Sequence, residues 1–332
     1  MNKWMKDHQK ILIILFFPYL FLLFLLVTPT KFSLTAPGGL TPVHENVTIE
    51  TKDISLNFYT IYVLSFHPMT PFQKMVSDVS ERISVKRMTK TEEDTTWKEQ
   101  YLQGQITKEV SLNTSVIKAY ELAHLKDDSI RVEYAYQGAY VYYRPSRIED
   151  LEIGDVIVAI NGQSLLDMSY TQFINLFYSL STVSLEILRN INSEMITKTI
   201  EYQKLEDESW MYFYPKYDII NTAPKIEYTH ENPWIGGPSG GMIQTLSIYA
   251  SLLNINLGEV KIAGTGTIEM DGSIGKIGGI VQKLYTAMDE RADIFIYPSG
   301  HISDIPNLSF PYEMVAVSSI EEAVNWLHEN FE

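Results

Sequence analysis

Hydrophobic residues along the chain follow three patterns, and each pattern predicts a different kind of element. An unbroken apolar run covers residues 11–27, with the composition and length of a membrane-spanning helix. Between residues 130 and 202, short β-branched and aromatic runs alternate with turn residues, which is typical of strands. In residues 204–332, apolar positions at helical spacing alternate with strand-like runs, which indicates a mixed α/β unit.

The first apolar run is preceded by three lysines and interrupted only by Pro18. A cleaved signal peptide is the alternative, but its apolar part is usually shorter and ends in small residues. Here the run continues into Thr-Pro-Thr-Lys at 28–31, so we expect an uncleaved single-pass anchor at 11–28 in the lipid bilayer. Because basic residues stay in the cytoplasm, residues 1–10 are predicted to be cytoplasmic and the rest of the chain extracellular.

Residues 29–128 combine several patterns. The stretch 32–51 is rich in Thr, Pro and Gly, and we expect a stalk that leads into the first strands. The run 58–66 is β-branched and aromatic, which predicts a strand. From 71 to 125 the sequence becomes helical and charged, with a solvated polar turn at 89–96. The whole segment is predicted to pack on the units that follow it.

A glycine-rich motif surrounds Ser239 and opens a helical pattern. The sequence Gly-Gly-Pro-Ser-Gly-Gly at 236–241 is followed by apolar residues at helical spacing up to Leu253, so Ser239 is expected in the first helical turn. Glycines such as Gly237 and Gly240 leave the hydroxyl uncrowded, and the N–H groups of a helix start face the same space. This environment suits a nucleophile and a developing oxyanion, although a serine at a helix start is also a common cap.

Lys283 lies on an apolar stripe of a second predicted helix. It follows Ile280 by three positions and precedes Leu284 and Ala287 on the same face. Burial lowers a lysine pKa toward neutrality, and a neutral amine can take the proton of a serine hydroxyl. The alternative is that the aliphatic part of the Lys283 side chain lies along the core and its amine reaches water. A pairing with Ser239 is favoured because each residue has the environment that the other's chemistry requires.

Three motifs, in order, resemble the proteolytic domain of Lon-type serine-lysine peptidases. They lie at residues 237–241, 262–268 and 272–283. The resemblance implies that residues 204–332 form an α/β (α+β) Lon-type proteolytic domain. It is specific because three separate motifs match in the right sequence order.

The same resemblance implies roles for individual residues. Ser239 matches the family's nucleophile, Lys283 its general base, and Thr265 a threonine that orients the lysine amine. Backbone N–H groups near Gly237 to Gly240 are expected to stabilise the oxyanion. The chain departs from the family at Gly240, where alanine is usual, and the lost methyl is expected to loosen the helix start slightly.

Residues 129–203 resemble a PDZ domain through Leu-Glu-Ile-Gly-Asp-Val-Ile at 151–157 and the Asn-Gly turn at 161–162. The resemblance implies a small β-rich domain that binds extended peptides by adding a strand to a sheet edge. A purely structural β-rich spacer is the alternative. The residues that match the family's carboxylate-binding loop are Gly138, Ala139, Tyr140 and Val141.

The composition and net charge of the chain argue against several kinds of partner and site. The net charge of −15 argues against a nucleic-acid partner, because phosphate neutralisation needs clustered Lys and Arg. With no cysteine there is no thiol nucleophile, disulfide or cysteine metal site, and no His, Asp or Glu spacing suggests a metal. The dipeptide Gly275-Lys276 lacks the rest of a phosphate loop, so neither a nucleotide nor another cofactor is expected.

Lon proteases have an ATPase on the same polypeptide, whereas this chain has an apolar anchor and a PDZ-like unit in that place. In this it resembles the membrane-anchored, ATP-independent peptidases of Gram-positive bacteria. The resemblance implies an extracytoplasmic serine endopeptidase that processes secreted peptides or exposed, unfolded segments of surface proteins.

Two alternatives stay open at this point. One is a catalytically inert surface protein in which the PDZ-like unit binds peptides. The other is an α/β-hydrolase esterase, since the serine motif also fits Gly-x-Ser-x-Gly. That fold needs a histidine after the serine, for which His301 and His328 are the candidates.

Overall fold

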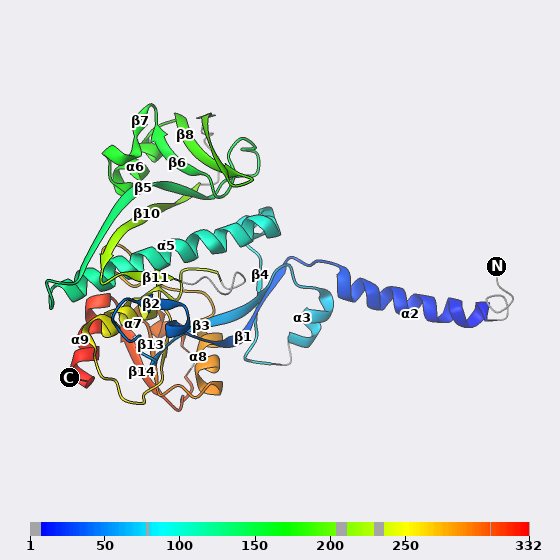
Figure 1. Cartoon of the computed structure of the whole chain (residues 1–332). Coiled ribbons are helices and arrows are strands. Elements are labelled where there is room, and N and C mark those ends of the chain that lie inside the picture. Colours follow the sequence, from blue (N-terminus) through cyan, green and yellow to red (C-terminus); the bar gives the residue numbers. More distant parts are fainter. Residues whose placement is uncertain (1–7, 78–79, 204–210, 229–235, 306, 332) are drawn as a thin grey trace.

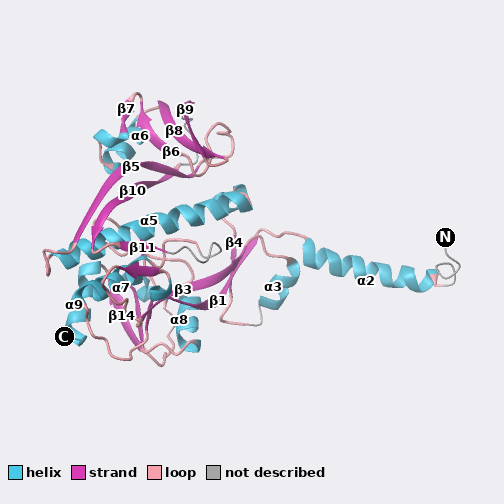
Figure 2. Ribbon diagram, in the orientation of Figure 1, coloured by secondary structure: helices cyan, strands magenta, loops and turns pink. Residues whose placement is uncertain are grey.

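The protein is a mixed α/β structure in which one apolar N-terminal helix projects from a body with two six-stranded sheets (Figures 1 and 2). The computed structural model describes residues 8–77, 80–203, 211–228, 236–305 and 307–331. Within this part of the chain, α2 (Gln9–Val27) is the one helix long and apolar enough to cross a membrane, and a signal sequence has the same character. Its apolar side chains are exposed along its length.

The first sheet joins strands from both ends of the chain. Its order is β14-β13-β12-β3-β1-β4, with β3, β12, β13 and β14 parallel and β1 antiparallel to both neighbours. The strands are β1 (Phe32–Pro42), β3 (Phe58–Phe66), β4 (Ser84–Arg87), β12 (Ile262–Gly264), β13 (Ile294–Pro298) and β14 (Glu313–Val317). The C-terminal unit that the motifs indicate therefore shares its sheet with the N-terminal segment.

The prediction of a stalk at 32–51 is wrong. Most of this stretch is β1, which is paired with both β3 and β4, and the short β2 (Val47–Ile49) pairs with β11 (Ile226–Tyr228). The proline and glycines that suggested a loop lie at a bulge, where the register shifts between Pro37 and Gly39. A bulge tolerates these residues inside a strand, and local composition does not distinguish it from a loop.

Helices cover both faces of the first sheet. α7 (Gly241–Leu253) and α9 (Ile320–Phe331) cover one face, and α8 (Ile280–Asp289) covers the other. The first part of the chain adds α3 (Pro71–Ser77), α4 (Lys90–Asp94) and α5 (Trp97–His124). Side chains of β13 alternate between the two faces: Ile294 and Ile296 pack with α7 and α9, and Phe295 and Tyr297 pack with α8. α5 packs on the outside of α7. The turn predicted at 89–96 contains α4, which begins with a capping box at Thr89.

The second sheet has its own core under α6 (Tyr170–Ser179). Its order is β10-β5-β6-β8-β9, with β7 beside β6. The strands are β5 (Arg131–Tyr143), β6 (Val156–Ile160), β7 (Gln163–Ser164), β8 (Thr182–Ile191), β9 (Glu194–Gln203) and β10 (Tyr212–Ala223). Because β10 pairs with β5 along its length, this sheet extends past the boundary predicted at residue 203.

The four residues expected at a carboxylate-binding loop lie inside β5 instead. Ala139 pairs with Pro215 on one side and with Ile157 on the other, so the sheet occupies both edges of the strand here. Gly138, Ala139, Tyr140 and Val141 are all buried. The expectation of a loop at these residues is therefore wrong, because β5 is one continuous strand of 13 residues.

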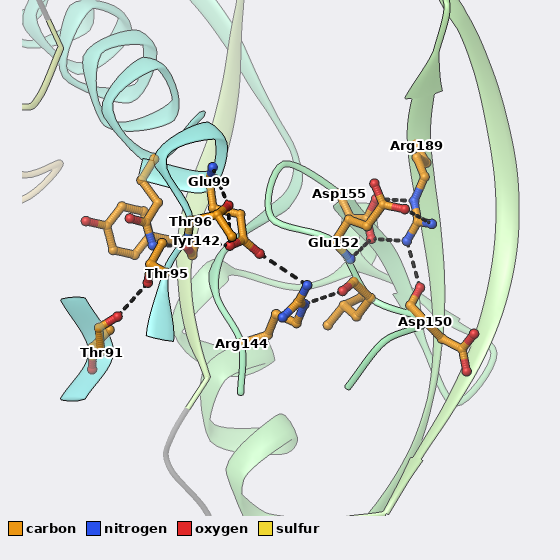
Figure 3. Close-up of polar contacts among 12 residues, drawn as sticks. Thr91, Thr95, Thr96, Glu99, Tyr142, Arg144, Asp150, Glu152, Asp155 and Arg189 are labelled. Atoms are coloured by element: carbon orange, nitrogen blue, oxygen red, sulfur yellow. Dashed lines mark hydrogen bonds and ion pairs between the residues drawn. The ribbon is translucent and has the colours of Figure 1, made fainter. Parts of the chain in front are cut away.

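A buried ion pair holds the turn that precedes β6 (Figure 3). Arg189 donates two hydrogen bonds of 2.7 Å to the two carboxylate oxygens of Asp155, and others to Glu152 and to the carbonyl of Asp150. Asp155 is 1% exposed and Arg189 is 6% exposed. Asp155 is the acidic residue of the Gly-Asp motif at 151–157, so this pair fixes the turn that the motif predicted.

We expect Arg189→Leu to lower the free energy of unfolding of the second-sheet unit by about 3 kcal/mol, because a buried Asp155 would lose its partner. Thermal unfolding of the full chain in detergent, followed by circular dichroism, measures the change. Lys225→Leu is the matched control, since it breaks the exposed pair with Glu227 and should leave the melting temperature unchanged. Equal melting temperatures for the two variants would contradict the prediction.

Candidate active site

Ser239, Thr265 and Lys283 converge at the end of β12. Lys283 Nζ lies 2.7 Å from Ser239 Oγ and 2.8 Å from Thr265 Oγ1. Ser239 comes from the loop before α7, Thr265 directly follows β12, and Lys283 lies in the first turn of α8. The carboxyl end of a parallel strand thus joins two helices from opposite faces of the sheet at one point.

Lys283 is buried, with 2% of its surface exposed. Its neighbours on α8, Ile280 and Leu284, belong to the core between this helix and the sheet. Burial lowers the pKa of Lys283 from its ordinary value of 10.5 to about 7. The amine is bonded to two hydroxyls inside the protein, which excludes the alternative in which it reaches water.

Thr265 is fully buried and fixes the direction of the amine. Its hydroxyl donates to the carbonyl of Ser239 at 3.0 Å, so its oxygen can only accept from the amine of Lys283. Gly266 N–H also donates to the Ser239 carbonyl, at 2.8 Å. With one N–H of the amine on Thr265, a neutral amine can turn either its second N–H or its lone pair toward the serine hydroxyl.

The helix after the serine begins two residues later than predicted. α7 starts at Gly241 with Gly240 as its N-cap, and Ser239 lies in the turn before them. No side chain caps this helix. The alternative role of Ser239 as a helix cap is therefore excluded, and its hydroxyl is bonded to Lys283 instead.

Two of the candidate oxyanion donors are already occupied. Gly237 N–H donates to the carbonyl of Gly104 at 2.9 Å, which corrects the expectation that Gly237 faces the reacting carbonyl. Met242 N–H, at the helix start, donates to Gly266 O at 3.1 Å. The N–H groups of Ser239 and Gly240 form no hydrogen bond with any residue that the structure describes. These two groups can receive a developing negative charge.

The loop that contains Ser239 packs against α5, a contact that the sequence did not predict. A Cβ added to Gly236 would lie 2.9 Å from Gly104 Cα, so only glycine permits this approach. Ser111 Oγ donates to the carbonyl of Pro238 at 3.1 Å, and Ser115 Oγ to that of Gly241 at 2.9 Å. The signal in the sequence was the row of small residues at 104, 111 and 115, which fall on one face of a helix.

The side chain of Thr60, from β3, lies beside Gly240. A Cβ on Gly240 would lie 3.0 Å from the methyl carbon of Thr60. The backbone of Gly240 is in the right-handed helical region, so it does not itself require glycine. The methyl of Thr60 therefore occupies the space next to the serine where an alanine side chain would point.

Neither histidine proposed for an esterase is bonded to Ser239. His301 Nε2 accepts from Ile277 N–H at 2.9 Å, and its Nδ1 lies 2.8 Å from Asp304 Oδ2. His328 Nε2 is bonded to the hydroxyl of Tyr249 at 2.8 Å. His301 thus stabilises the turn before α8, and His328 stabilises the packing of α9 on α7. Residues 229–235, including His230 and the segment before the serine motif, lie outside the described residues.

The free edge of β10 is closed by side chains. The hydroxyl of Tyr170 donates to Phe213 O at 2.7 Å, and that of Tyr178 donates to Met211 O. Farther along the strand, Asn113 Nδ2 donates to Tyr217 O at 2.8 Å. A peptide could add to this edge only by displacing these contacts.

No protein-family model matches the chain, and no match is found among curated proteins. Among the described residues, no group of three or more His, Cys, Asp or Glu side chains could hold a metal ion.

We expect Lys283→Met to raise the free energy of unfolding by on the order of 4 kcal/mol at pH 7. The unfolded lysine binds a proton up to pH 10.5 and the folded one only up to about 7, so the wild type loses stability as pH falls from 10.5 to 7. Methionine does not bind a proton, so the variant does not lose stability in this way. The gain should therefore shrink as pH rises toward 10. Lys126→Met, at an exposed position, is the control and should show no such pH dependence.

Proposed function

We propose that this protein is a serine endopeptidase in which Ser239 is the nucleophile and Lys283 the general base. The observation that supports it most is the 2.7 Å contact between the serine hydroxyl and a buried amine whose pKa is about 7. A lysine of this kind is half deprotonated at neutral pH, which suits proton abstraction. A structural role for an amine so buried would call for a carboxylate partner, and here its partners are two hydroxyls.

In the proposed mechanism, the neutral Lys283 amine takes the proton of Ser239 while Oγ attacks the scissile carbonyl. The carbonyl oxygen becomes an oxyanion that accepts hydrogen bonds from N–H of Ser239 and Gly240. The ammonium then gives its proton to the leaving amine, and an acyl-enzyme remains. Water adds to the acyl group through the same base, which releases the acid and restores the serine. Thr265 holds the amine in line through both steps.

The proposal keeps the Lon-type and PDZ-like identities that the motifs suggest. The Ser, Thr and Lys of the Lon-like motifs lie within hydrogen-bonding distance, which supports the family assignment for the first sheet and its helices. The second sheet, with the Gly-Asp and Asn-Gly turns, is proposed as the PDZ-like module. Because the chain lacks a phosphate-loop motif, the proposed substrates are peptides or already unfolded segments.

We also propose that α2 is an uncleaved anchor, with a cytoplasmic N-terminus and an extracellular catalytic body. A helix of 19 residues is about 28 Å long, which is close to the apolar thickness of a bilayer. Its exposed apolar surface would be unstable in water. Basic residues before α2 favour the cytoplasmic side for the N-terminus.

Substitution of the nucleophile tests the proposal directly. Ser239→Ala is expected to lower kcat/KM toward quenched fluorescent peptides at least about 1000-fold, since no other group replaces the attacking oxygen. Labelling by a fluorophosphonate should disappear in the same variant and in Lys283→Ala. Ser129→Ala, at an exposed position, is the matched control and should retain both activities. Parental cleavage by Ser239→Ala would refute the assignment and leave the inert binding protein as the better hypothesis.

The pH dependence of kcat/KM gives an independent test of the base. Only the neutral amine accepts the serine proton, so kcat/KM should fall about tenfold per pH unit below the Lys283 pKa of about 7 and level off above it. A series of initial rates from pH 5 to 10, at constant ionic strength, measures the profile. A rate that keeps rising to pH 10 would mean that the amine titrates like an exposed lysine.

A further inference from the structure

The short helix α3 presents its apolar face outward. Phe72, Met75 and Val76 fall at positions i, i+3 and i+4, so they form one stripe. Their exposed fractions are 37%, 60% and 50%. A surface helix of a soluble protein normally turns such a stripe toward the core. Here the apolar stripe is on the outside of the molecule, and it needs a partner other than water.

Two more exposed apolar side chains lie at the end of β3, the strand that precedes α3. Leu64 and Phe66, at the end of the strand that leads to α3, are 46% and 45% exposed. We call the five residues the α3 patch: Leu64, Phe66, Phe72, Met75 and Val76. Side chains of this size clustered on adjoining elements are characteristic of an interaction site.

The patch has a fixed position beside the end of α2. The residues after α2 and those before α3 are joined by hydrogen bonds, in which N–H and Oγ1 of Thr30 donate to Met69 O and Met69 N–H donates to Phe32 O. α2 and α3 are themselves in contact. In Figure 1, α3 lies where α2 meets the body. The orientation of α3 relative to the apolar helix is therefore set by the fold.

Cationic side chains lie on α3 and β4, the elements next to the end of α2. The ammonium of Lys74, which is on α3, is 3.5 Å from the centre of the Phe32 ring. Arg87 of β4 is paired opposite Phe32 and is exposed. In a chain with a net charge of −15, positive groups beside an apolar surface match anionic lipid headgroups.

We propose that the α3 patch is inserted into the interfacial layer of the same bilayer that α2 crosses. Apolar side chains next to a span, with cations on the same or adjoining elements, lie at the depth where acyl chains meet headgroups. The catalytic body would then be attached to the membrane at two points, which prevents it from rotating about α2. The inference rests on the proposed anchor role of α2, and it does not depend on the peptidase activity.

The absence of cysteine from the chain makes site-specific labelling straightforward. Single variants Met75→Cys, Leu15→Cys and Leu125→Cys, each coupled to a polarity-sensitive fluorophore, are compared in the full chain in nanodiscs with one quarter anionic lipid. Leu15 reports on α2. Leu125 is the matched control, because it is a 77% exposed apolar residue at the far end of α5. Doxyl-labelled lipids, which quench only nearby fluorophores, are then added.

We expect doxyl lipids to reduce the Met75 signal at least about twofold and to leave the Leu125 signal unchanged. The Met75 label should be quenched best by doxyl groups near the headgroup, and the Leu15 label by groups deep in the acyl chains. A water-exposed Met75 label with a quenched Leu15 label would overturn the proposal. A blue-shifted Met75 label without lipid quenching would also overturn it, since the patch would then contact a second copy or another protein. An unquenched Leu15 label would instead refute the anchor role of α2.

Discussion

The exclusion of water from one amine is the constraint on which the site depends. An ammonium group in an apolar environment is unfavourable by several kcal/mol, so the pKa of Lys283 stays near 7 only while α8 stays packed on the sheet. That packing is provided by β1 and β3, which contact α8 directly. Thr35 and Val63 lie against Gly279, where α8 begins. Strands from the first part of the chain therefore set the chemistry of a lysine near its end.

The serine is positioned by a different upstream element. α5 accepts a hydrogen bond from Gly237 and donates one to the carbonyl of Pro238, and these contacts shape the turn that holds Ser239. The same helix contacts the second sheet, where Gln103 Nε2 donates to Tyr142 O at 2.9 Å and Tyr140 donates to Glu109 at 2.8 Å. Figure 1 shows α5 between the second sheet and the rest of the body. α5 is thus the physical connection through which a change at the second sheet could reach the serine.

The parts of the fold that the sequence predicts are those with local signals. The apolar stripe of α8 could be recognised because helical spacing is visible within ten residues, and the Asn-Gly turn because its type depends on two residues. β1 could not be recognised, since a strand rich in Thr, Pro and Gly is stable only with β3 and β4 on either side. The burial of Ala139 depends on its pairing with β10 and β6 in the same way.

The difference between local signals and long-range contacts applies to the candidate site as well. Ser239 and Lys283 could be paired in advance because each lies in a local environment that is unusual for its side chain. Gly104 could not be assigned a role, since a glycine in a predicted helix has many explanations, and its contact with Gly237 joins residues far apart in the chain. The surroundings of Gly240 could not be predicted either, because the methyl of Thr60 that lies beside it comes from a strand far away in the sequence.

The short link between α2 and β1 places the start of the first sheet close to the end of the apolar helix. Only residues 28–31 separate the two elements, so β1 begins within about 20 Å of the end of α2 even if the link is fully extended. β1 then reaches α8 directly, where Gly38 N–H donates to Thr286 Oγ1 at 3.1 Å. If α2 crosses the bilayer, β1 therefore connects the anchor to α8 directly, with no flexible linker between the two, so the position of α8 relative to the membrane is set by the fold of β1 and its neighbours.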